Sequence, residues 1–141
     1  PQSGFLLGYY THILTDICNN TEVWTPFRMA QGGTFDRETY DLYGNECRNV
    51  DYVLYTRHPD ARGLLEALER ADAYTLSSRI RAEEVAALRF SLLHERFEPR
   101  PMPDVSGNRY FRLEDTEAFI RRAAELVRET ATPPEGAACR R

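Results

Sequence analysis

Three side chains that could bind a metal ion follow one another at four-residue spacing near the start of the sequence. They are His12, Asp16 and Asn20. In an α-helix, residues four apart lie one above the other, so these side chains share one line if the helix continues through Asn20. An imidazole nitrogen and a carboxylate oxygen one turn apart can both reach a zinc ion at about 2.0 to 2.2 Å. The spacing therefore predicts a zinc site that uses His12 and Asp16, with Asn20 as a further ligand.

The sequence around this pair is almost wholly apolar from Phe5 to Cys18. Hydrophobic residues recur there at helical spacing over a wide arc, so we expect a central helix. An unpaired carboxylate in such surroundings would cost several kcal/mol unless it met a cation or hydrogen-bond donors. A metal ion is one partner that would satisfy Asp16. The alternative is a polar contact inside a helical bundle, made with His12 or with Tyr, Arg or backbone donors.

The segment F-L-L-G-Y-Y-T-H-I-L-T-D, residues 5–16, resembles the central helix of the bacterial zinc-dependent phospholipase C family. In that family an apolar G-Y-x-x-H-x-x-x-D run carries two metal ligands, which correspond to His12 and Asp16 here. The resemblance implies a helical bundle, a metal cluster bound by His and Asp, and a metal-activated water that attacks a phosphate ester. It therefore implies a small-molecule or lipid-like phosphoester substrate.

The sequence also departs from the family pattern. Relatives often have a Trp-His pair at the level of Asn19 and Asn20, and Asn is a poorer zinc ligand than His. Relatives also carry further ligands, an early His and a Pro-Asp, in an N-terminal part. Because the chain starts at Pro1 and enters an apolar helix at once, we expect its natural beginning to lie upstream. The second hypothesis is a non-catalytic helical binding or interaction module with a degenerate metal site.

Other candidate ligands have simpler interpretations. His94 and Glu98 also stand four apart, but Pro99 follows and the segment is charged, which favours a solvated helix end. His58 precedes a proline in a predicted turn, so we expect it to cap a helix or face solvent. The acidic residues between 36 and 51 favour a solvated helix face. The sequence has neither a G-x-S-x-G elbow nor a Walker loop, and Cys18 has no basic neighbour.

Hydrophobic periodicity predicts an all-α fold, a single-domain bundle of about five helices over residues 1–131. Pro99, Pro101 and Pro103 predict an extended strap, and residues 132–141 are expected to form a flexible tail. We expect inward faces that include Leu88 and Ile120. Sustained period-two alternation, the signature of strands, is absent. The predicted helices span residues 4–19, 35–54, 60–73, 81–97 and 114–130.

Composition narrows the function classes. The chain has 141 residues and a formal charge of −4, and its 18 basic residues are spread along the sequence, which argues against a nucleic-acid partner. Three cysteines without C-x-x-C spacing favour reduced thiols and a cytoplasmic protein. The longest apolar stretch is interrupted by His12 and Asp16, so we expect no transmembrane segment and no signal peptide. Substrate identity and oligomeric state do not follow from the sequence.

Overall fold

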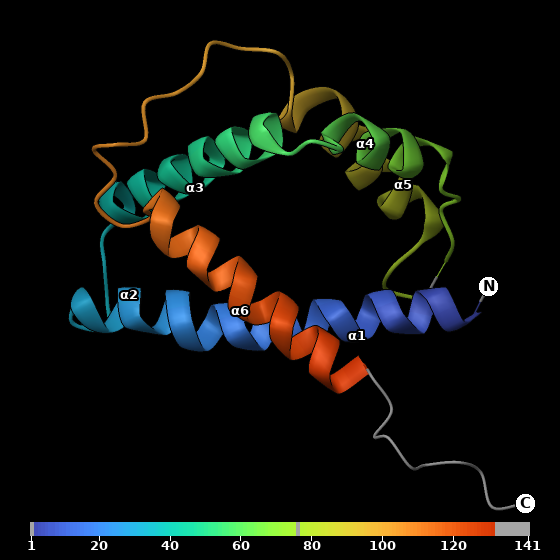
Figure 1. Ribbon diagram of the computed structural model, residues 1–141, viewed down its shortest axis with the longest axis horizontal. Helices are drawn as coiled ribbons and strands as arrows, with labels where there is room; N and C mark the ends of the chain where they lie inside the picture. The colour runs from blue at the N-terminus through green and yellow to red at the C-terminus, as the bar shows by residue number, and fades with distance from the viewer. Residues whose placement is uncertain (1, 76, 132–141) are drawn as a thin grey trace, which may run out of the picture. The chain divides into compact units, whose positions relative to one another are not determined.

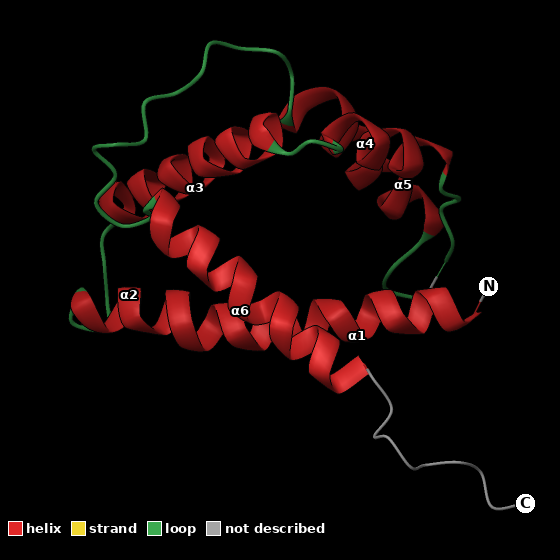
Figure 2. Cartoon of the chain, viewed as in Figure 1, coloured by secondary structure: helices red, strands yellow, loops and turns green. Residues whose placement is uncertain are grey.

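The computed structural model of the protein describes residues 2–75 and 77–131, and these are helical or irregular, as Figure 2 shows. Within these residues the only β pairing is an isolated bridge between Ser77 and Ile80. The all-α prediction is therefore confirmed. The helices form five continuous rods, which are α1–η1–α2 (Gln2–Asn19, Asn20–Trp24, Thr25–Ala30), α3 (Arg37–Arg57), α4 (Ala61–Arg70), α5–η2 (Ala82–Ser91, Leu92–Arg96) and α6 (Leu113–Ala131).

The chain divides into two compact units. Unit 1 comprises residues 1–44 and 108–141, and unit 2 comprises residues 45–107. Helix α3 contributes residues to both. The flexible tail predicted for residues 132–141 lies outside the described residues. None of the described helices is long and apolar enough to cross a membrane.

The first rod is longer than the sequence predicts, because the loop expected after Asn19 does not form. One π-helical turn, η1, carries the chain into α2, and the Thr21 hydroxyl donates to the Ile17 carbonyl at 2.9 Å. Pro26, which has no N–H to donate, lies at the junction of η1 and α2, where the helical hydrogen-bonding pattern changes. The rod ends at Gly32 and Gly33, both at positive φ, whose N–H groups bond back to the preceding turn.

In unit 1, α6 packs along α1, and Figure 1 shows α6 crossing that helix. Cys18 of α1 and Ala123 of α6 are both buried. Thr116, also buried, donates its hydroxyl to the Arg112 carbonyl at 2.8 Å and closes the first turn of α6. Among the described residues, apolar side chains on the opposite side of α1, such as Ile13 and Ile17, remain exposed.

In unit 2, the core forms on α3 around Val50 and Val53, which are almost completely buried. The Tyr52 hydroxyl fastens the proline-rich strap to this helix. It accepts from the Arg100 N–H and donates to the Arg100 carbonyl, each at 2.9 Å. The strap predicted from its prolines is therefore present and is tied down by one buried tyrosine.

Two expected inward residues are exposed. The exposed fraction of Leu88 is 63% and that of Ile120 is 45%. Both lie on helices that the sequence predicts, but among the described residues no neighbouring element covers those positions. Periodicity identifies an apolar face and does not say whether anything packs on it.

Candidate functional site

The structure brings His12 and Asp16 together on α1, as their spacing predicts. The His12 Nε2 atom lies 3.3 Å from the Asp16 Oδ2 atom. Two ligand atoms bound to one zinc ion at about 2.0 to 2.1 Å with tetrahedral angles stand about 3.3 Å apart. The two side chains therefore hold their donor atoms at a separation that fits a shared zinc ion, and the same distance also permits a direct ion pair.

The surroundings of this pair differ from the sequence prediction. The side chains of His12 and Asp16 are 67% and 61% exposed, so Asp16 does not suffer the desolvation that a buried carboxylate would. The premise that the pair is buried in an apolar environment is wrong for the described structure. Because water can solvate both groups, the pair does not need a metal ion to exist.

The face of α1 that carries the pair is itself unusual. Counting along the helix from Asp16 to its start, His12, Tyr9 and Phe5 fall on one stripe, and the rings of Phe5 and Tyr9 are stacked with centroids 6.3 Å apart. Gly8, one turn before His12, has no atom within 4 Å of the position a Cβ would take. The potential ligands are thus flanked by exposed aromatic rings and by open space.

This stripe belongs to a larger exposed apolar surface. Soluble proteins rarely expose contiguous apolar patches of this kind unless the patch has a binding role. The sequence predicts a central α1, and this prediction is wrong, because among the described residues only the side of α1 that faces α6 is covered. We call this surface the open face of α1; its exposed apolar members are Phe5, Leu6, Tyr9, Tyr10, Ile13 and Ile17.

Asn20, the third residue of the predicted line, remains in the helical rod as the first residue of η1. Its side chain is exposed, as are those of His12 and Asp16. Among the residues that the structure describes, no group of three His, Cys, Asp or Glu side chains gathers as a metal site would require. On α1, the described residues therefore offer two potential ligands, His12 and Asp16, and the side-chain amide of Asn20 one turn beyond them.

The other histidines are engaged elsewhere. The His94 ring packs against Phe90 with centroids 4.5 Å apart, and His58 Nδ1 accepts from the Asp60 N–H at 3.1 Å. Asp51 of α3 pairs with Arg96 of η2. His58 lies at the turn predicted there, whereas Asp51, which was expected on a solvated helix face, is half-buried and ion-paired.

Burial raises the pKa of the Cys47 thiol, and the neighbouring Asp51 carboxylate raises it further. A thiol whose pKa is raised is less ionised at neutral pH and is a weaker nucleophile.

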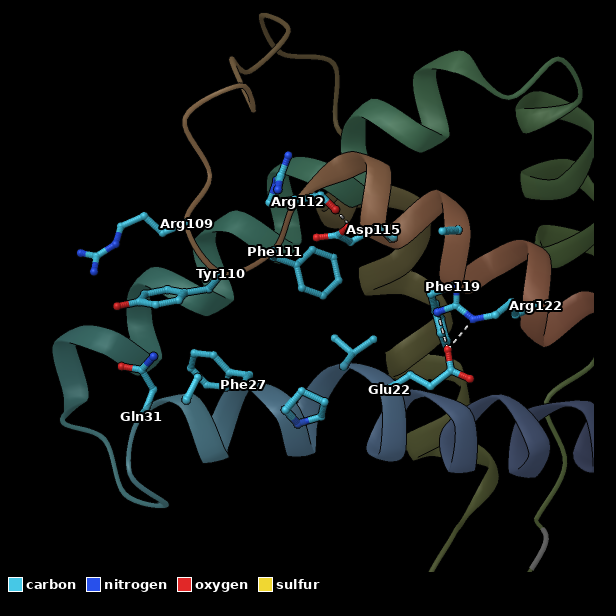
Figure 3. Close-up of a pocket in the computed structure, with 15 residues that line it drawn as sticks. Glu22, Phe27, Gln31, Arg109, Tyr110, Phe111, Arg112, Asp115, Phe119 and Arg122 are labelled. Carbon is cyan, nitrogen blue, oxygen red and sulfur yellow. Dashed lines mark hydrogen bonds and ion pairs between the residues drawn. The ribbon is translucent and has the colours of Figure 1, made fainter.

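A second candidate site, which the sequence reasoning did not identify, is a pocket of about 410 Å³ in unit 1. It is lined by the rod around Phe27, by the first half of α6 and by the segment that precedes α6, shown in close-up in Figure 3. The Phe27 ring packs against Tyr43 in a tilted arrangement with centroids 4.4 Å apart, and against Tyr110 in an edge-to-face arrangement with centroids 5.3 Å apart. One wall of the pocket is therefore the aromatic core of unit 1.

Charged residues line the same pocket. Arg122 donates through Nε to Glu22 at 2.7 Å, and Figure 3 shows this pair at one end beside Phe119. At the other end the Arg109 guanidinium lies 5.1 Å from the Tyr110 ring centroid. The sequence contained one indication of this site. Two aromatic residues stand between two arginines in R-Y-F-R, residues 109–112, directly before a helix whose first turn carries acidic residues.

Comparison of the chain with protein-family models, with curated proteins and with solved structures gave no match.

Proposed function

We propose that this chain forms part of a zinc-dependent phosphoester hydrolase in which His12 and Asp16 bind the metal. The observation that carries the proposal is the 3.3 Å separation of His12 Nε2 and Asp16 Oδ2, which matches two ligands of one tetrahedral zinc ion. The G-Y-x-x-H-x-x-x-D pattern of α1 supports the same assignment through its resemblance to the phospholipase C family.

Each residue of the stripe has a role in this proposal. His12 in its neutral form donates a lone pair from Nε2, and Asp16 contributes a negative charge that offsets part of the metal charge. Bound zinc would lower the pKa of a water ligand to about 7 and so supply hydroxide for attack on phosphorus. The stacked Phe5 and Tyr9 rings provide an apolar surface for the non-polar part of an ester.

Two ligands do not complete a zinc site, which takes three protein ligands in catalytic centres. Asn20 lies one turn further along the rod and offers an amide oxygen, a poorer donor. The resemblance implies that an early His and a Pro-Asp complete the family site. On this proposal, those ligands approach the open face of α1, and their approach covers its apolar residues.

The metal content of the full-length protein tests this proposal. Mass spectrometry of the purified protein is expected to find stoichiometric zinc, and His12→Ala and Asp16→Ala are expected to lose it. His58→Ala is the matched control, because His58 is an exposed histidine engaged with a turn. Turnover of a chromogenic phosphodiester should follow the metal through the series. Wild-type protein without bound metal would refute the assignment.

A second candidate function is a helical interaction module that has kept the fold without the chemistry. The open face of α1 favours it, because an exposed apolar surface on a helix is suited to binding a partner. Thermal unfolding with added zinc and with chelator separates the two candidates, since a ligand that binds only the folded state raises the midpoint. A midpoint unchanged by zinc supports the module, and a zinc-dependent rise supports the hydrolase.

A further inference from the structure

We propose that helix α1 binds the α1 helix of a second copy of this chain, with the two helices side by side and antiparallel. The contact uses a line of apolar residues on the open face of α1, whose exposed fractions lie between 39% and 62%. We call this line the dimer seam; its members are Leu6, Tyr10, Ile13 and Ile17. The seam contains neither His12 nor Asp16, so the inference does not rest on the zinc proposal.

The dimer seam and the stripe that carries His12 and Asp16 are separate lines on α1. Each seam residue follows a stripe residue by one position, as Ile13 follows His12 and Ile17 follows Asp16. Consecutive residues of an α-helix point about 100° apart around the axis. A second copy can therefore cover the seam while further metal ligands reach the stripe from the neighbouring side.

The spacing of the seam suits a pair of identical helices. Its residues are four, three and four positions apart, the alternation with which two helices pack along each other. These spacings are the same when read in reverse, so a two-fold axis can bring the two seams together in opposite directions. In that arrangement Leu6 of one copy meets Ile17 of the other, and Tyr10 meets Ile13. Every seam residue then faces an apolar residue of the second copy.

The charges of α1 permit this pairing. Asp16 is the only acidic residue between Gln2 and Asn19, and the same range contains no Arg or Lys. In the antiparallel arrangement Asp16 stands level with Leu7 of the second copy, which separates the two Asp16 side chains by about 13 Å along the helix axis. This separation exceeds the Debye length of about 8 Å at physiological ionic strength. Like-charge repulsion between the copies is therefore weak.

The exposed area of α1 is sufficient for a small interface. Leu7 and Tyr9, which are 52% and 58% exposed, border the seam at the positions that flank such a helix pair. If each bordering and seam side chain buries about half of roughly 200 Å², the two copies together bury about 1,200 Å². This area is at the lower end of the range for specific complexes, so we expect a reversible dimer.

Sedimentation equilibrium of the full-length protein, from about 1 to 200 µM, tests the proposal. The wild-type protein is expected to show an equilibrium between monomer and dimer, both with zinc and with chelator. Leu6→Arg and Ile17→Asp should each weaken the dimer at least about tenfold, because each places unpaired charges in an apolar contact. An equimolar mixture of the two variants should recover the dimer, since the introduced opposite charges face each other only if the helices run antiparallel.

Leu64→Arg is the matched control, because Leu64 is a similarly exposed leucine on α4, and it should leave the dimer unchanged. Leu6 and Ile17 are mainly exposed, so both variants should fold, which circular dichroism checks. A monomeric wild-type protein, a dimer that both seam variants leave intact, or a mixture that stays monomeric would each overturn the proposal. A dimer that dissociates with chelator would overturn it too, because a metal ion would then bridge the copies.

Discussion

At the scale of the residue, the exposure of the His12–Asp16 pair decides how its chemistry can be tested. A structural pair buried in a bundle would cost the fold several kcal/mol when broken. The observed pair is mainly solvated, and solvated pairs on helices contribute about 0.3 to 0.5 kcal/mol. The two residues can therefore be replaced without disturbing α1, so a loss of metal or activity would report on binding and not on folding.

Asp16→Asn is accordingly expected to change the free energy of unfolding by less than about 0.5 kcal/mol. Urea denaturation of wild-type and variant protein measures this change. A destabilisation of about 2 kcal/mol or more would mean that Asp16 has a structural role, as the sequence alternative of a buried polar contact supposed.

Asp36 gives α3 a pH-dependent N-cap. Its Oδ1 accepts from the Thr39 N–H at 2.8 Å, and this bond, with a contribution from the Thr39 hydroxyl, lowers the pKa of Asp36 below 3.8. A carboxylate with a lowered folded pKa stabilises the fold fully above its unfolded pKa and loses that contribution as pH falls through the folded value.

The Asp36→Asn substitution keeps a side-chain oxygen that can accept the capping hydrogen bond, but the amide does not ionise over this pH range. The melting temperature of wild-type protein should therefore drop relative to Asp36→Asn as pH falls from about 5 to about 2.5. Thermal unfolding across this range measures the difference. A difference that stays constant over the range would contradict a capping carboxylate.

At the scale of the element, much of the helical framework follows from hydrophobic periodicity and turn residues. The sequence predicted five helices and the strap between Pro99 and Pro103, and the structure contains them. It predicted a break after Asn19 because Asn and Thr favour turns. This prediction was wrong: no break forms, because the single π-helical turn η1 continues the helix into α2.

The first rod also contains two glycines with opposite roles. Gly8 lies in the interior of α1 with open space around its Cβ position, so Gly8→Ala should stabilise the fold by about 1 kcal/mol through helix propensity. Gly32 ends α2 at a φ of 74°, so Gly32→Ala should destabilise it by about 1 to 2 kcal/mol. Denaturation of both variants gives the signs, and the prediction fails if both shift in the same direction.

The attachment of the proline-rich strap to α3 depends on the hydroxyl group of Tyr52. Tyr52→Phe removes both hydrogen bonds to Arg100 and is expected to cost about 1 kcal/mol. The Arg100 amide should then exchange with solvent faster, which hydrogen-exchange NMR measures. Tyr55→Phe is the control, because the Tyr55 contact with this region is ring stacking on Phe97. Equal exchange at Arg100 in both variants would show that the hydroxyl does not hold the strap.

At the scale of the whole molecule, the sequence could pair His12 with Asp16 but could not determine what surrounds them. Spacing along a helix is local information, whereas burial depends on which distant segments pack on that helix. The wide apolar arc of α1 indicated a central position, and among the described residues only the side toward α6 is covered. The pocket of unit 1 was missed for the same reason, since it joins residues 22–31 to residues 109–122.

The open face of α1 links these observations to function. It places His12 and Asp16, the proposed zinc ligands, among exposed apolar residues, and an exposed apolar surface of this kind commonly has a binding role. On this account, metal binding and coverage of the face occur together. The proposed function requires that His12 is a metal ligand.

The most direct measurement is long-range ¹H–¹⁵N NMR of the histidine side chains of the full-length protein, with zinc and with chelator. The account predicts that zinc changes the His12 Nε2 resonance alone, leaves His58 and His94 unchanged, and has no such effect in Asp16→Asn. A His12 resonance that is the same with zinc and with chelator, or a similar response from all three histidines, would contradict it.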